Sequence, residues 1–176
     1  KDYEMTYFIR KVDSTQWEDE LPSEHNILNM AVDGITNCCK TSGNTLSIWQ
    51  TSSNDPLSEE NQKLLTGMAM SLDRPIPFTF IFLSLEELQS LGLELEYSLG
   101  DTPFVEVASS HRDISNLTLQ KMGELAWVIH GKVNDDEEMK LVAADDLIQY
   151  TKSLFNKVDD LPDEKKSQKK WRGLYQ

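Results

Sequence analysis

The longest apolar run of the chain, residues 78–83 (FTFIFL), lacks a regular alternation with polar residues. A strand with one face in water alternates apolar and polar side chains, so an unbroken run of this length predicts a central strand covered on both faces. The run is far shorter than the roughly 20 residues that cross a bilayer. It therefore predicts a sheet with helices packed on it, which is the α/β (or α+β) class.

Strands and helices are expected to alternate along the chain. We expect strands at residues 3–12, 45–49, 78–83 and 93–99, with a hairpin return at 104–107. Helices are predicted from Ser23, from Asp55 or Ser58, from Ser84, from Ile114 to a stop at Gly131, and over 144–158. This order predicts a mixed sheet of about five strands with a helical C-terminus.

Two local signals sharpen this prediction. Ser84 with Glu87 three residues later fits a capping box, and Gly92 can end the short helix that follows. Beyond it, leucines alternate with Glu94 and Glu96, which predicts a half-buried strand with both carboxylates on one wet face.

The chain of 176 residues suits one domain. We predict a globular domain over residues 1–161 and a basic segment over 162–176 that is mobile unless it folds back on the acidic body. Three of the first four residues are charged, and this segment carries no apolar signal core.

The charge of the chain is strongly one-sided, with a net value of −13. Residues 75–110 contain no lysine or arginine. Such a surface repels nucleic acid and anionic membranes and attracts cationic proteins. The partner-binding residues predicted from this stretch are Glu86, Glu87, Glu94, Glu96, Asp101 and Glu106.

Two adjacent cysteines, Cys38 and Cys39, are the only ones in the chain. Neighbours do not form an ordinary disulfide, so we expect two reduced, buried thiols and a cytoplasmic protein. The three histidines lack the spacing of a metal site, and no metal or cofactor is predicted.

The tripeptide at residues 111–113, His-Arg-Asp, occurs in the kinase catalytic loop, but the other kinase motifs are missing. We therefore expect Asp113 to favour the start of a helix, and no catalytic residue is predicted.

Together these features predict a non-catalytic acidic protein that docks on a basic, nuclease-like protein, as immunity proteins and antitoxins do. One alternative is an enzyme or ligand-binding protein with a site around Asp101, His111 and Asp113. Another is a regulatory subunit that uses its C-terminal helix as an interface. The oligomeric state stays open.

Overall fold

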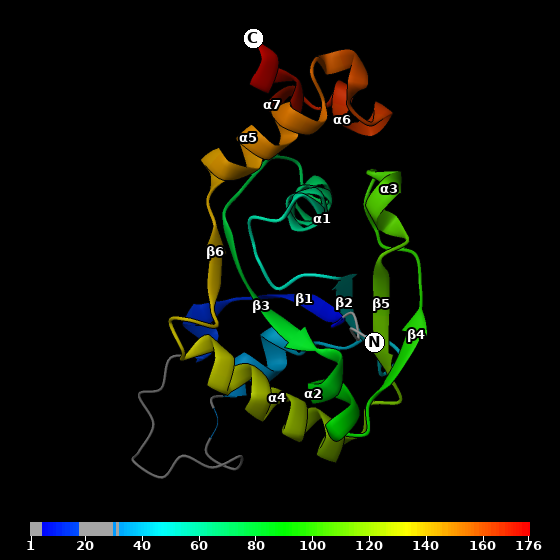
Figure 1. The fold of residues 1–176 in the computed structure, drawn as a ribbon, viewed down its shortest axis with the longest axis vertical. Coiled ribbons are helices and arrows are strands. Elements are labelled where there is room, and N and C mark those ends of the chain that lie inside the picture. The colour runs from blue at the N-terminus through cyan, green and yellow to red at the C-terminus, as the bar shows by residue number, and fades with distance from the viewer. Residues whose placement is uncertain (1–4, 18–29, 31) are drawn as a thin grey trace.

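The computed structural model describes residues 5–17, 30 and 32–176, and in this part of the chain six strands form one sheet (Figure 1). Their order across the sheet is β4-β5-β2-β1-β3-β6, and every neighbouring pair is antiparallel. The strands are β1 (Tyr7–Val12), β2 (Leu46–Thr51), β3 (Phe78–Ser84), β4 (Glu94–Tyr97), β5 (His111–Ser115) and β6 (Lys140–Val142). The α/β class and the helical C-terminus are confirmed, and the sheet is antiparallel with six strands where a mixed sheet of about five was expected.

Helices cover both faces of the sheet (Figure 1). One face, called here the α1 face, carries α1 (Glu59–Met70), α3 (Val105–Ala108), α5 (Ala144–Leu154), α6 (Asp163–Ser167) and α7 (Lys169–Arg172). The opposite face, called the α4 face, carries α2 (Leu85–Ser90), α4 (Leu119–Val133), the 3-10 helix η1 (Ser14–Trp17) and the π-helix η3 (Gly34–Cys38).

The strand β3 is covered on both faces, as its sequence predicts. Its side chains alternate between two buried clusters, with Ile81 and Leu83 on the α4 face and Phe80 and Phe82 on the α1 face. All of them are at most 6% exposed. The strand therefore needs apolar residues at successive positions, because each of its two sides packs against a separate buried cluster.

Several predicted helix boundaries are confirmed. Ser84 begins α2 with a full capping box, in which the Glu87 amide donates to Ser84 Oγ at 3.1 Å and the Ser84 amide donates to Glu87 Oε2 at 2.7 Å. Gly92 follows α2 with φ of +62°, the left-handed conformation that glycine adopts without strain. Ser58 caps α1 by accepting from the Asn61 amide.

The segment after β4 differs from the prediction. Residues 105–108 form the short helix α3, and the hairpin partner of β4 is β5. Asp113 therefore lies inside a strand and does not start a helix. The helix α4 begins only at Leu119, capped by Thr118, and it continues past Gly131 to Val133.

The basic C-terminal segment folds back on the α1 face. Of the two expectations for this segment, mobility or packing on the acidic body, the structure shows the second. The indole of Trp171 is fully buried, and its Nε1 donates to the Leu72 carbonyl at 3.0 Å. The Lys165 ammonium, also buried, donates to the same carbonyl at 3.1 Å and to Glu164 and Gln168. The boundary at residue 162 stays a prediction.

The first part of the helix predicted from Ser23 lies outside the described residues, and its later part contains η3. Of its expected apolar stripe, Val32 is 69% exposed, whereas Cys38 and Cys39 are buried free thiols. The first strand, expected over residues 3–12, is described from Tyr7.

Candidate functional site

Two predicted carboxylates lie on the α1 side of the edge strand β4. Leu95 packs against the core on the α4 face, and side chains alternate along a strand. Glu94 and Glu96 therefore point to the opposite side, and both are exposed. This is the wet acidic face that the alternation predicts, although the strand stops at Tyr97, which is 63% exposed.

Glu96 lies directly opposite Asp113 across the β4–β5 pair. The next strand in the same row contributes Ser47, whose Oγ is 3.4 Å from Asp113 Oδ1. The Asp113 side chain is half-buried, and the Glu96 side chain is exposed. Like charges at directly opposite positions disfavour a sheet, so the register of Glu96 with Asp113 is an unfavourable pairing.

The neighbouring cations point away from this pair. The Arg112 guanidinium lies 5.2 Å from the centre of the Tyr97 ring and donates to the backbone carbonyls of Ser109 and His111. The Lys11 ammonium lies 5.3 Å from the centre of the Phe78 ring. Within the described residues, no ion pair involves Glu96 or Asp113.

Two further predicted carboxylates extend the same surface. Asp101 lies in the turn after β4, and Glu106 lies in α3; both are exposed. Phe104 and Val107 anchor this segment in the core of the α1 face, which sets the side on which it lies. Figure 1 shows β4, the turn and α3 along one edge of the molecule. We call this set the β4–α3 surface: Glu94, Glu96, Asp101, Glu106 and Asp113.

The remaining two predicted residues lie elsewhere. Glu86 and Glu87 belong to α2, which packs on the α4 face through Leu88. The Glu87 carboxylate caps α2 and also forms an ion pair with Lys132 at 3.0 Å. Glu86 and Glu87 therefore lie apart from the other acidic side chains found between positions 75 and 110.

Burial lowers the pKa of Lys132, but hydrogen bonds to the carboxylates of Glu138 and Glu87 outweigh this effect and raise it overall. The Lys132 ammonium therefore stays charged, and the Glu87 carboxylate already forms an ion pair with it within the chain.

The alternative site around His111 is only partly assembled. The His111 Nδ1 is 2.7 Å from Ser98 Oγ, and its ring packs edge-on against Trp49 with centroids 5.0 Å apart. Burial lowers the pKa of His111, against the opposing effects of Asp113 and the hydrogen bond with Ser98. Asp113 shares the strand face of His111, whereas Asp101 lies in the exposed turn.

A hydroxyl beside an imidazole is one part of a nucleophilic site, but such chemistry also needs a space for substrate. His111 is only 7% exposed, and the cavities of about 370, 350 and 530 Å³ described below are lined by other residues. The contact of Ser98 with His111 is typical of a satisfied, buried histidine.

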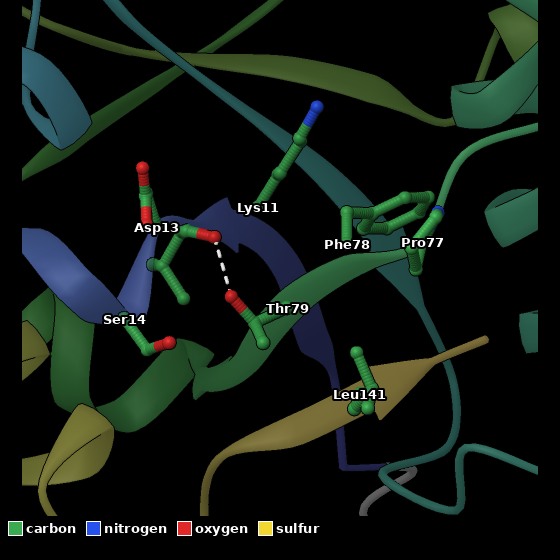
Figure 2. A pocket seen from close by; sticks show the side chains of 8 residues that line it. Lys11, Asp13, Ser14, Pro77, Phe78, Thr79 and Leu141 are labelled. Carbon is green, nitrogen blue, oxygen red and sulfur yellow. Dashed lines mark hydrogen bonds between the residues drawn. The ribbon is translucent and has the colours of Figure 1, made fainter.

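Two cavities flank the end of β1. The first, of about 370 Å³, is shown in Figure 2, where Thr79 Oγ1 donates to the Val12 carbonyl at 2.7 Å. It holds one ammonium and one carboxylate beside apolar side chains, with the labelled residues Lys11, Asp13, Ser14, Pro77, Phe78, Thr79 and Leu141.

The second cavity, of about 350 Å³, lies next to Arg10 and Cys38. The Arg10 guanidinium donates to the backbone carbonyls of Ser47, at 2.7 Å, and Cys38. Burial raises the pKa of the nearby Cys39 to about 11, which keeps this thiol protonated and unreactive at neutral pH. These groups join η3 to the sheet.

A wider groove of about 530 Å³ opens between α3 and the C-terminal segment. It combines apolar side chains with four carboxylates, and its lining includes Phe104, Val105, Glu106, Phe155, Asp160, Leu161, Asp163 and Glu164. Glu106 belongs both to this groove and to the β4–α3 surface, so the two features are continuous.

The described residues contain no group of three or more His, Cys, Asp or Glu side chains placed to hold a metal ion. None of the helices in this part of the chain is long and apolar enough to cross a membrane. No family model, curated protein or solved structure matches this chain.

Proposed function

We propose that this chain is a non-catalytic acidic protein that docks on a basic protein partner through the β4–α3 surface. The proposal depends on one observation. Glu96 and Asp113 lie opposite each other across β4 and β5, and within the described residues neither carboxylate forms an ion pair. A fold gains nothing from such a contact, whereas a lysine or arginine from a partner would relieve it.

The overall charge supports the same function. A net charge of −13 attracts a basic protein over long distances and speeds its association. The same charge repels nucleic acid, whose phosphates are also negative. Charge complementarity of this kind is typical of immunity proteins and antitoxins that bind basic nucleases, and we place this chain in that functional class. The buried free thiols of Cys38 and Cys39 fit a reducing cytoplasm.

The test is binding to the products of neighbouring genes, expressed together with this chain. A single basic partner that copurifies at low salt and is released at high salt is the expected result. A partner that is acidic, or binding that is insensitive to salt, contradicts the proposal.

A further inference from the structure

We propose that the groove between α3 and the C-terminal segment, the α3–α6 groove, receives one bulky apolar side chain of the same basic partner, flanked by its lysines or arginines. This inference rests on the proposed function and adds the feature by which the partner is recognised. It is carried by the apolar floor of the groove, its acidic rim and its continuity with the β4–α3 surface.

The floor of the groove is aromatic. The rings of Phe104 and Phe155 meet edge to face with centroids 5.0 Å apart, and Leu161 is buried beside them. At the lip, Val105 is 80% exposed, whereas Val107 and Ala108 of the same helix are buried. Val105 therefore adds an exposed apolar side chain to the lining of the groove.

The rim of the groove is acidic. Asp163 and Glu164 form ion pairs with Lys166 and Lys165, at 2.7 and 2.9 Å. Glu106 and Asp160 line the same groove and take part in no ion pair within the described residues. The rim therefore keeps free negative charge on either side of the apolar floor, which selects cationic residues next to the anchor.

The walls of the groove are held in place by hydrogen bonds between residues that are far apart in sequence. On one side, Thr102 Oγ1 donates to the Gly67 carbonyl at 2.6 Å and ties the α3 segment to α1. On the other side, Tyr175 donates to the Phe155 carbonyl at 2.6 Å. A groove held in this way is already formed before binding, so little ordering cost opposes the anchor.

The negative charge of the rim favours a basic occupant of the groove over a second copy of this chain or an uncharged ligand. A second copy of this chain would bring another net charge of −13 to an acidic surface, and repulsion would oppose it. An apolar ligand without charge would leave Glu106 and Asp160 unmatched. A basic segment with one apolar anchor satisfies both the floor and the rim.

Two capped pentapeptides test the inference. One has a phenylalanine between two pairs of lysines, and its control has alanine in place of the phenylalanine. Each is titrated into the ¹⁵N-labelled full chain, and amide shifts are followed by NMR. The phenylalanine peptide is expected to bind about ten-fold more tightly and to shift the amides of Val105 and Phe155, because its ring is removed from water.

Variants of exposed apolar residues provide the matched comparison. Val105→Asp should abolish the preference for phenylalanine over alanine, since it makes the lip polar while keeping the surface acidic. Leu119→Asp makes the same chemical change at the start of α4, on the other face of the sheet, where Leu119 is 91% exposed. This variant should keep the preference unchanged.

The outcomes separate the two proposals. If both peptides bind equally and shift the amides of Glu94 and Glu96 alone, the groove inference is overturned and the β4–α3 surface stands. If neither peptide binds at low salt, both proposals are overturned. If the preference persists in Val105→Asp, the anchor lies elsewhere and the groove inference is again overturned.

Discussion

Glu96 and Asp113 occupy directly opposite positions on two antiparallel strands, and their side chains lie on the same face of the sheet. Opposite positions in a sheet bring side chains within about 5 Å, where like charges repel. The pair is therefore expected to lower the stability of the free protein, and a cation from the proposed partner would relieve the repulsion.

Neutralising one member of this pair should stabilise the protein. Glu96→Gln keeps the shape of the side chain and is expected to raise the free energy of unfolding by about 0.2–1 kcal/mol. Urea denaturation at neutral pH measures the change. Glu137→Gln, at an exposed position outside the strand pair, removes the same charge and should have a smaller effect. A loss of stability in Glu96→Gln would show that the carboxylate has a favourable contact in the folded protein.

Reversing the charge of β4 should slow partner association. The double variant Glu94→Lys with Glu96→Lys is expected to reduce the association rate by about ten-fold at low salt and to weaken its salt dependence. Stopped-flow kinetics with the basic partner measures both. The matched control reverses Glu86 and Glu137, which lie outside the β4–α3 surface, and circular dichroism checks folding. An equal slowing in the control would mean that net charge alone matters.

The C-terminal segment should contribute strongly to stability. Trp171→Ala removes a fully buried indole and its hydrogen bond to the Leu72 carbonyl. Large-to-small changes of this kind cost about 3–5 kcal/mol, so thermal unfolding should occur at a much lower temperature. Arg172→Ala, next to it and exposed, serves as the control. Equal melting temperatures for the two variants would contradict the packing of this segment on the body.

Two helical glycines should respond in opposite ways to alanine. A Cβ at Gly67 in α1 would lie 2.2 Å from Val107 Cγ2, so Gly67→Ala is expected to destabilise the protein by about 1–3 kcal/mol. A Cβ at Gly131 in α4 would meet nothing within 4 Å. Gly131→Ala should therefore stabilise the protein by about 0.5–1 kcal/mol, since alanine favours helix. Chemical denaturation distinguishes the two signs, and destabilisation by Gly131→Ala would be inconsistent with a helix that continues to Val133.

The stability of the protein should fall in mild acid because of His111. Burial lowers its pKa in the folded protein, so the unfolded chain, with a pKa of about 6.5, takes up the proton first. The stability that neutral His111 contributes is present above about pH 6.5 and is lost as the pH falls below it. The wild type should lose more stability than His111→Gln between about pH 7.5 and about pH 5.5. Equal losses would place the relevant proton elsewhere.

The sequence predicts the fold best where local and tertiary signals agree. The apolar run of β3 and the capping box of Ser84 with Glu87 are both confirmed, because each depends on residues close in sequence. It fails at residues 104–107, where Val105 and Val107 flank Glu106 as they would in a strand. The short helix forms there because Val107 packs into the α1-face core, a tertiary contact that alternation does not reveal.

The candidate site is only partly visible in the sequence. Alternation correctly predicts that Glu94 and Glu96 share an exposed face, but it does not group Asp113 with them, because the sequence favours a helix start at that position. Residues 111–115 do not alternate apolar and polar side chains, so local periodicity does not indicate this strand, which is defined by its pairing with β2 and β4. The α3–α6 groove cannot be read from the sequence, because it forms where Phe155 and residues 160–164 lie beside residues 103–106, far apart along the chain.

The position of β1 in the sheet has a consequence for the path of folding. It pairs with β2 on one side and β3 on the other, so it joins the β4-β5-β2 half to the β3-β6 half. The pairing of this strand therefore requires contacts between residues far apart in sequence, such as Tyr7 with Ser84. Closing such long loops delays assembly, and refolding is expected to take milliseconds to seconds, with both halves joining through this single strand.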